Sequence, residues 1–220
     1  MKVSLLMLTY NAPRYVAKSI VGIKKTRQVD YELIVIDNHS KIKTRALLIV
    51  LRLLGYIDKM YFNKENALFA KGNNLASTLT STNSTHYCLI NSDIDVRNPM
   101  WLSKLCSLHP ENGGISAFGA VLSDPVRADG YCMLIDKFLY DKYLLDEQFE
   151  WWWSVTKLES QVLKDGYQIV AVRNHEKYLH HYGGASGNGF ANAKGMDIGI
   201  DEVKSWFDKK KNDVMIIESV

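Results

Sequence analysis

The chain has 220 residues, is 47% apolar, and carries 27 basic against 24 acidic side chains for a net charge of +3. This length can bury the core of one domain, and the small net charge without a long basic run argues against nucleic-acid binding. The three cysteines have no CxxC spacing. This argues for a reducing compartment and against a disulfide framework or zinc site built from them.

The N-terminal region predicts a first strand and no signal peptide. Residues 1–13 contain one lysine and a short apolar run without a small-residue cleavage site. Elsewhere no segment approaches 18 uninterrupted apolar residues, and the apolar stretch 46–57 is interrupted by Arg52. We therefore expect a soluble, cytoplasmic protein without a transmembrane segment. Residues 42–57 are expected to form an exposed apolar surface suited to peripheral membrane association.

The first half of the chain alternates between strand and helix patterns. Proline at position 13 begins the first predicted helix, and Gly55 ends the second. Repeated strand and helix units indicate a mostly parallel sheet with helices on both faces. The predicted strands are residues 2–8, 32–36, 57–62 and 86–91, and the predicted helices are residues 13–25, 41–54 and 70–79.

Polar clusters follow the four predicted strands. Each cluster alone is typical of a turn, because Asn and Asp favour turns. In parallel sheets, however, ligands bind at the carboxyl ends of the strands, so four clusters at those ends predict one ligand site. The clusters are residues 9–11, 37–38, 63–66 and 93–95.

The pattern changes after residue 99. Residues 100–108 and 156–164 are predicted helices, and residues 114–122, 131–135 and 168–172 are predicted strands. A glycine-rich tail spans residues 187–199, and a short basic helix is predicted at residues 201–211.

Asp93 and Asp95 follow the fourth strand one residue apart. If the strand continued through them, both carboxylates would face the same side of the sheet. Two unit charges about 5 to 6 Å apart repel by roughly 3 kcal/mol at an effective dielectric near 20, a cost that a cation or water offsets. Taken alone, the pair is typical of a polar turn ending a strand.

In combination, residues 2–186 resemble the family 2 glycosyltransferases of the GT-A fold. The segments that carry the resemblance occur in the family's order: VSLLMLTYNAP, LIVIDNHS, NKENALFAKGNNLA, INSDIDV, LDEQFEWWW, KDGYQIVAV and HHYGGAS. The resemblance implies an α/β fold with a single Rossmann-like domain over residues 1–220. Residues 1–98 would be the nucleotide-sugar-binding half, and residues 99–220 the acceptor-binding half and tail.

The resemblance also implies an activity. The enzyme would move a sugar, with inversion, from a nucleoside-diphosphate sugar to a saccharide or lipid-linked acceptor, as in polysaccharide biosynthesis. The reaction would depend on Mn²⁺ or Mg²⁺, which suit oxygen ligands and stabilise the charge of the leaving diphosphate. The implied metal ligands are Asp93, Asp95 and His181, with His180 as the alternative register.

The resemblance assigns a donor site. Asp37 would accept a hydrogen bond from the nucleotide base, Thr9 would line the same pocket, and Asp93 would lie near the ribose or the metal. Gly183 and Gly184 would let the backbone approach the phosphates. Ala67 stands where the family commonly has glycine. The implied donor-site residues are Thr9, Tyr10, Asn11, Asp37, Asn38, Asn66, Gly72, Asn74, Asn91, Ser92 and Asp93.

The family pattern breaks at the general base, the group that takes the proton of the acceptor hydroxyl. Ser154 and Val155 stand where the family has a Glu-Asp pair, and Lys157 where a further acid is frequent. Three explanations stay open: a nearby carboxylate takes the role, the alignment is locally shifted, or the protein binds donor without efficient transfer. The candidate carboxylates are Glu159, about 6 Å further along the helix axis, then Glu150, Asp146 and Glu147.

Trp151, Trp152 and Trp153 are predicted to bind the acceptor, because aromatic faces stack on sugar rings. If they lie on a strand, Trp152 faces one side and the other two face the opposite side. Two other classes of function compete with transfer. One is an inactive sugar-nucleotide-binding protein, favoured by Val155; the other is a nucleotidyltransferase, whose usual glycine- and arginine-rich loop is missing from TYNAPRY.

Overall fold

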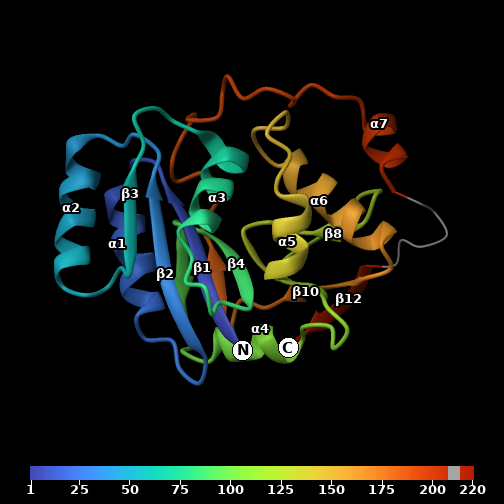
Figure 1. The fold of residues 1–220 in the computed structure, drawn as a ribbon, viewed down its shortest axis with the longest axis horizontal. Helices are drawn as coiled ribbons and strands as arrows, with labels where there is room; N and C mark the ends of the chain where they lie inside the picture. The colour runs from blue at the N-terminus through green and yellow to red at the C-terminus, as the bar shows by residue number, and fades with distance from the viewer. Residues whose placement is uncertain (208–213) are drawn as a thin grey trace.

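The computed structural model describes residues 1–207 and 214–220 and is built on an eight-stranded sheet with helices on both faces (Figure 1). The strand order is β12-β10-β6-β9-β4-β1-β2-β3, and all neighbours are parallel except β9, which is antiparallel to β4 and β6. The mostly parallel sheet is confirmed. Its strands are β1 (Lys2–Thr9), β2 (Asp30–Asp37), β3 (Lys59–Phe62), β4 (His86–Asn91), β6 (Gly114–Phe118), β9 (Cys132–Asp136), β10 (Gln168–Asn174) and β12 (Val214–Ser219).

The helices cover the sheet in two layers. One face packs against α1 (Pro13–Ile23), α2 (Ile42–Leu53) and α4 (Trp101–Ser107), and the other against α3 (Leu68–Thr78), α5 (Lys137–Tyr143) and α6 (Trp153–Lys164). Successive strand residues supply opposite layers: Leu5 and Met7 of β1 belong to the first core, and Leu6 to the second. The sheet therefore separates two hydrophobic cores.

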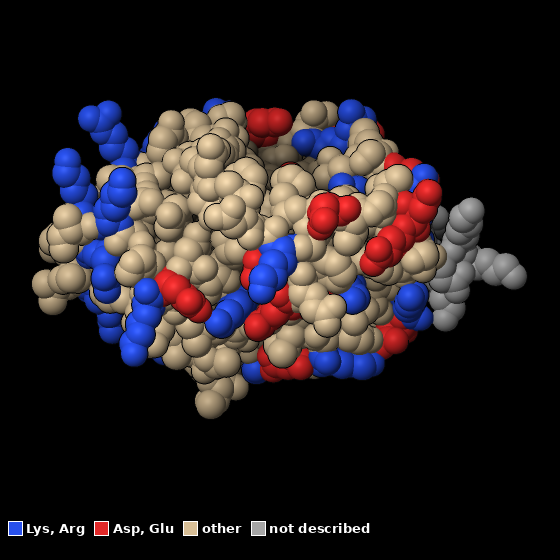
Figure 2. All heavy atoms as spheres, turned by 90° about the horizontal axis from the view of Figure 1, so that it is seen from above, with Lys and Arg blue, Asp and Glu red and all other residues tan. Residues whose placement is uncertain are grey.

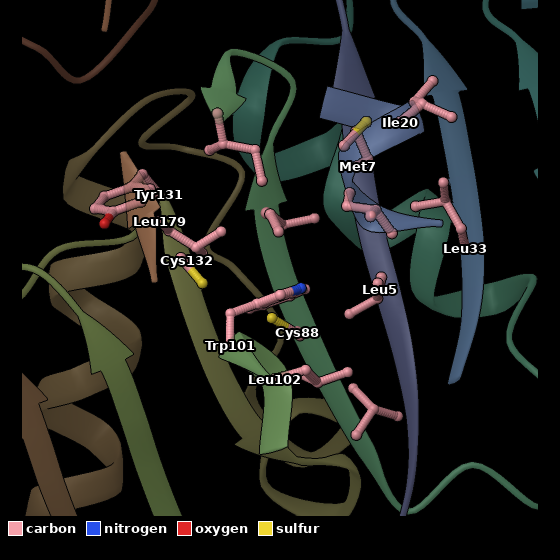
Figure 3. Close-up of a cluster of buried hydrophobic side chains, with 14 of the residues drawn as sticks. Leu5, Met7, Ile20, Leu33, Cys88, Trp101, Leu102, Tyr131, Cys132 and Leu179 are labelled. Carbon is pink, nitrogen blue, oxygen red and sulfur yellow. The ribbon is translucent and has the colours of Figure 1, made fainter. Parts of the chain in front are cut away.

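The core on the α1 side shows how the cysteines are used. Figure 3 shows Leu5 and Met7 of β1 near Leu33 of β2, with Cys88 beside Trp101 of α4. Cys88 and Cys132 are fully buried in this core. Both act as small apolar side chains in this core.

One predicted strand is shorter than expected, and a second is absent. The predicted strand 114–122 stops at Phe118, because Gly119 adopts a φ of +103° that extended strands do not use. The chain continues into β7 (Ala120–Val121), which pairs with β8 (Arg127–Ala128). The tryptophan segment is not a strand either: Trp151 and Trp152 form a bend and turn, and α6 begins at Trp153.

Two short elements complete the described chain. After β4, the strand β5 (Ile94–Val96) pairs antiparallel with β11 (Leu179–His181). Near the end, α7 (Ile200–Ser205) replaces the start of the predicted basic helix, whose remainder at residues 208–211 lies outside the described residues. None of the helices in the described ranges has both the length and the apolarity to cross a bilayer.

The parallel strands β1, β2, β3 and β4 end at one edge of the sheet, which we call the carboxyl edge. In Figure 1 this edge is at the top, and the segment that follows β11 runs across it toward α7. The predicted polar clusters follow these four strand ends, so the fold brings them to the same edge.

Candidate active site

A cavity of about 700 Å³ opens at the carboxyl edge. This volume lies within the usual range of small-molecule sites. Of the predicted site residues, those that line the cavity are Thr9, Tyr10, Asn38, Asn66, Asn91, Ser92, Asp93, Trp151, Trp152, Trp153 and His181. The predicted residues that do not line it are Asn11, Asp37, Gly72, Asn74, Asp95, Glu150 and Glu159.

Asp93 and His181 form the polar pair of the cavity. The ring nitrogen Nε2 of His181 lies 3.2 Å from Oδ1 of Asp93 and 3.1 Å from Nδ2 of Asn91. The backbone N–H of Ala185 donates to the other carboxylate oxygen at 3.3 Å. Partial burial acts to raise the pKa of the Asp93 carboxyl, but the hydrogen bond and charge of His181 outweigh it and lower that pKa. Asp93 is therefore ionised at neutral pH.

Asp95 has a different set of partners. Its Oδ2 lies 2.9 Å from the Lys18 ammonium of α1 and accepts from the Tyr182 hydroxyl at 3.5 Å. Hydrogen bonds to Tyr182 and Asp95 raise the pKa of Lys18. The expectation that both aspartates share one environment is wrong for this conformation, because Asp93 pairs with a histidine and Asp95 with a lysine.

His181, not His180, is the histidine that reaches Asp93. His181 stacks on Tyr131 with 4.3 Å between ring centroids, which fixes the orientation of the imidazole. His180 lies opposite Asp95 in the β5–β11 pair and contacts the edge of Tyr182. The two following glycines, Gly183 and Gly184, both have a φ of +68°, which turns the chain so that Ala185 can donate to Asp93.

Asp37 is buried below the cavity. Its side chain is fully buried, accepts from the Thr9 hydroxyl at 3.0 Å and from the Ser40 N–H at 3.1 Å, and lies 3.8 Å from Nε of Arg45. Both oxygens are occupied by protein donors. In this conformation Asp37 joins β1 to the turn after β2 and does not present an acceptor to a nucleotide base.

Three further predicted donor-site residues hold the scaffold together. Asn11 accepts from the Lys41 N–H at 2.9 Å. Gly72 lets α3 approach β1, since a Cβ there would lie 2.9 Å from Cδ1 of Leu8. Asn74 donates to the Leu145 carbonyl at 2.8 Å. Each contributes to the position of the cavity wall without facing the cavity.

The three tryptophans form one wall of the cavity. Trp151 stacks on Phe190 of the tail with 5.0 Å between centroids, and Trp152 and Trp153 meet edge to face at 6.4 Å. Trp152 is 50% exposed, so its face is free to contact a ligand. The indole N–H of Trp153 is buried and has no hydrogen-bond partner among the described residues. Because these residues turn into a helix instead of alternating along a strand, all three reach the same cavity.

Glu159 lies inside the protein, one helical turn beyond Val155 on α6. Its side chain is fully buried, Oε2 accepts from the Ala128 N–H at 2.9 Å, and Oε1 has no partner in the described structure. Burial raises the pKa of Glu159 to about 8, although the Ala128 hydrogen bond and the charge of Arg127 act in the opposite direction. A buried, protonated acid cannot take a proton from an acceptor, so this position disfavours Glu159 as general base.

The other predicted carboxylates have structural partners. Glu150 accepts from the Lys194 N–H at 2.8 Å and thereby holds the tail. Asp146 forms an ion pair with Lys157 at 2.6 Å. Glu147 accepts from Asn74 at 3.0 Å. None of the three is among the described residues that line the cavity.

No protein-family model and no curated sequence matches the chain. A mannosyltransferase from Pyrobaculum calidifontis, in complex with GDP-Man and Mn²⁺, superposes with a TM-score of 0.63 at 14% identity over 78% of this chain and 54% of its own. TarS 1–349 from S. aureus superposes with a TM-score of 0.62 at 13% identity over 94% and 70%. GalNAc-T7 with UDP, GalNAc and Mn²⁺ gives 0.64 at 10% identity over 76% and 41%.

The chain has the GT-A fold. It spans 48% of the TarS chain solved with UDP-GlcNAc and 54% of the mannosyltransferase chain, about half of each. At these sequence identities the likeness establishes the GT-A fold. The chemistry of the cavity must be inferred from the residues that line it.

Asp129 of this GT-A chain lines the cavity but was missed by the sequence analysis. It lies in the turn after β8, is partly exposed, and accepts from the Tyr131 N–H through Oδ1 at 3.3 Å. Its second oxygen accepts no hydrogen bond from the residues that the structure describes. The only local signal was the Asp129-Gly130 turn dipeptide, which looks like ordinary turn punctuation.

The tail was also missed as part of the site. Gly189 packs so closely on Tyr10 that a Cβ there would lie 2.6 Å from the ring, and its carbonyl accepts from Asn66 at 3.0 Å. Phe190 adds its ring to the tryptophan wall. The glycine-rich segment therefore forms part of the cavity wall between Tyr10, which follows β1, and Trp151.

Proposed function

We propose that this protein is an inverting glycosyltransferase of family 2 type that transfers a sugar from a nucleoside-diphosphate sugar to a saccharide or lipid-linked acceptor. The observation that supports this proposal best is one cavity in which an ionised carboxylate paired with an imidazole faces a wall of tryptophans. The Asp93–His181 pair suits a diphosphate with its cation, and the tryptophan wall suits sugar rings. The GT-A likeness supports the same class of reaction.

The residues present fit a divalent cation. Oδ1 of Asp93 and Nε2 of His181 are 3.2 Å apart, about the separation of two ligands on one ion, and carboxylate with imidazole suits Mn²⁺. Asp95 would join them after its ion pair with Lys18 opens. When bound, Mn²⁺ or Mg²⁺ would offset the negative charge that develops on the departing diphosphate. Asn91 and Ser92 would line the donor beside this pair.

Asp129 is the carboxylate best placed to accept the proton of the acceptor hydroxyl. It is partly exposed and lines the same cavity as Trp152 and Trp153, so a sugar resting on the indoles would bring a hydroxyl toward it. In an inverting reaction the acceptor hydroxyl attacks from the side opposite the leaving diphosphate. The general base therefore lies beside the acceptor, near the tryptophan wall, and not beside Asp93.

A lipid-linked acceptor is supported by the outer face of α2. Ile42, Ile49 and Leu53 are 78%, 46% and 81% exposed, at helical spacings that place them on one face. Residues 41–57 include basic side chains but no acidic one. Figure 2 looks onto the carboxyl edge and shows lysine and arginine side chains at the end of the molecule where α2 lies. An apolar face among cations suits an anionic membrane surface.

One observation favours a second function, the binding of sugar nucleotides without efficient transfer. Val155 lines the cavity at the position where the family resemblance places the general base, and valine accepts no proton. Under this alternative the donor site would bind its ligand normally and turnover would be absent. Nucleotide binding and turnover must therefore be measured separately.

Thermal-shift measurements with UDP, GDP, dTDP and CDP, each with and without Mn²⁺, test the donor site. We expect one nucleotide to raise the melting temperature only when Mn²⁺ is present, since a ligand at a hundredfold excess over its Kd stabilises the native state by about 2.7 kcal/mol. Asp93→Asn should remove the shift, and Asp129→Asn should keep it. If no nucleotide gives a shift, both proposed functions fail.

A further inference from the structure

A second cluster of ionisable side chains lies at the edge of the sheet opposite the cavity. His86 is the first residue of β4, Asp136 is its partner at the end of the antiparallel β9, and His109 follows α4. The Nε2 atoms of His86 and His109 lie 3.3 and 2.9 Å from the two carboxylate oxygens of Asp136. This is the one group of described residues in which three potential metal-ligating atoms lie within 4.8 Å of one another.

The Thr85 hydroxyl can hold His86 in a tautomer that leaves Nε2 as a metal ligand. The Thr85 hydroxyl lies 3.1 Å from the Lys2 carbonyl oxygen and 2.8 Å from Nδ1 of His86. A hydroxyl has one proton, and a carbonyl oxygen can only accept. When that proton is donated to Lys2, the Thr85 oxygen accepts from His86, which places the His86 proton on Nδ1 and its lone pair on Nε2.

His109 has the same arrangement. The Ser116 hydroxyl donates to the Leu105 carbonyl at 3.1 Å, and its oxygen lies 3.3 Å from Nδ1 of His109. In the tautomer protonated at Nδ1, neutral His86 and neutral His109 both direct the lone pair of Nε2 at the Asp136 carboxylate. Lone pairs and carboxylate oxygens at these distances repel unless a positive charge lies between them.

Three states satisfy the Asp136 carboxylate: neutral imidazoles that donate from Nε2–H and accept at Nδ1 from the two hydroxyls, doubly protonated imidazoles, or one metal cation bound to the Nε2 lone pairs. The side chains of His86, His109 and Asp136 are only 12%, 5% and 14% exposed, and the imidazole centroids are 4.9 Å apart. Double protonation would place two imidazolium charges side by side with little solvent around them. One carboxylate would then balance only one of the two charges. A single divalent cation leaves both imidazoles neutral.

We propose that His86, His109 and Asp136 bind a zinc ion. Two ligands at 2.0 to 2.1 Å from a tetrahedral ion are roughly 3.3 Å apart; the distance from His86 to Oδ1 of Asp136, 3.3 Å, matches this, and the distance from His109 to Oδ2, 2.9 Å, is shorter. Neutral imidazoles whose Nδ1–H is donated to a neighbouring oxygen are the usual form of zinc-ligating histidines. Two nitrogens and one carboxylate suit zinc better than manganese or magnesium, which prefer more oxygen ligands.

The bound ion would join three separate parts of the chain. It would fix the start of β4 to the end of β9 and to the turn between α4 and β6, where the Gly114 N–H donates to Asp136 at 2.7 Å. Because these residues lie at the edge away from the cavity, the ion would stabilise the fold and take no part in transfer.

Isothermal titration of the metal-free protein with Zn²⁺, without nucleotide, tests the proposal. His86→Gln and His109→Gln should each weaken binding by at least about tenfold. Asp93→Asn removes a ligand of the donor cavity, and His39→Gln removes an exposed histidine; both should keep one equivalent at wild-type affinity. Equal binding by His86→Gln, His109→Gln and wild type, or no binding by wild type, would overturn the proposal.

If a histidine variant does not fold, cobalt spectroscopy tests whether His86, His109 and Asp136 bind a metal ion. Co²⁺ added to Asp93→Asn should give the intense visible absorption of a tetrahedral nitrogen and oxygen site, and Zn²⁺ should remove it. A weak, octahedral spectrum in that variant would mean that the three residues form only a hydrogen-bonded cluster, and the zinc site would be rejected.

Discussion

Glu159→Gln tests whether the buried acid of α6 is protonated in the folded protein. Glutamine has nearly the shape of protonated glutamic acid, and its carbonyl oxygen can accept from the Ala128 N–H as Oε2 does. The substitution therefore removes the ability to ionise and keeps the packing. The pKa of Glu159 is about 8 in the folded state against 4.5 for an ordinary glutamate.

The sign and size of the effect follow from proton binding. Between pH 4.5 and about 8 the native state keeps the Glu159 proton and the unfolded chain loses it. Because the native state binds more protons, the free energy of unfolding falls as pH rises, with a slope approaching about 1.4 kcal/mol per pH unit. From pH 5 to pH 7 the wild type should lose roughly 2.5 kcal/mol relative to Glu159→Gln.

Urea denaturation of both proteins at pH 5, 6, 7 and 8 measures this difference. Other titrating groups contribute equally to the two proteins, so the difference between their unfolding free energies isolates Glu159. Glu111→Gln, which replaces an exposed carboxylate, is the matched control and should follow the wild type. Parallel pH profiles for wild type and Glu159→Gln would show that Glu159 is ionised in the fold, and the argument against it as general base would fail.

Two further substitutions test the acceptor wall and α2. Asp129→Asn should lower turnover by about 100-fold or more, as expected for loss of a general base, without changing the nucleotide-dependent thermal shift; normal turnover would exclude Asp129 from that role. Leu53→Glu should weaken binding to anionic phosphatidylserine vesicles by about tenfold or more, because it replaces an exposed apolar side chain with a negative charge. Phe138→Glu, at a 52% exposed position on α5, is the control, and equal loss in both would contradict a specific α2 surface.

The sheet and its helices were predictable because their signals are local. Apolar runs of strand length alternate with helical periodicity through the first half of the chain, and each residue's neighbours in sequence determine those patterns. Because β1 and β4 are parallel, the residues at their carboxyl ends lie at the same edge of the sheet, independent of how the side chains pack. Thr9 of the cluster 9–11 and Asp93 of the cluster 93–95 both line the cavity at this edge.

Side-chain exposure at that edge was not predictable. Asp37 and Asn74 follow the family pattern in sequence, yet both are buried and hydrogen-bonded to the protein. Burial of a polar side chain depends on partners far along the chain, such as Leu145 for Asn74. Asp129 was missed for the converse reason: a turn residue becomes a site residue only when α6 and β11 bring other walls of the cavity beside it.

The two aspartates after β4 illustrate the limit of arguing from spacing. One uninterrupted strand through residues 91–95 would place both carboxylates on the same face, but β4 ends at Asn91 and the chain bends at Ser92 and Asp93 before β5 begins. The repulsion that seemed to require a metal is already offset, by His181 for Asp93 and by Lys18 for Asp95. The case for a donor-site cation therefore depends on the Asp93–His181 pair and not on the spacing of the two acids.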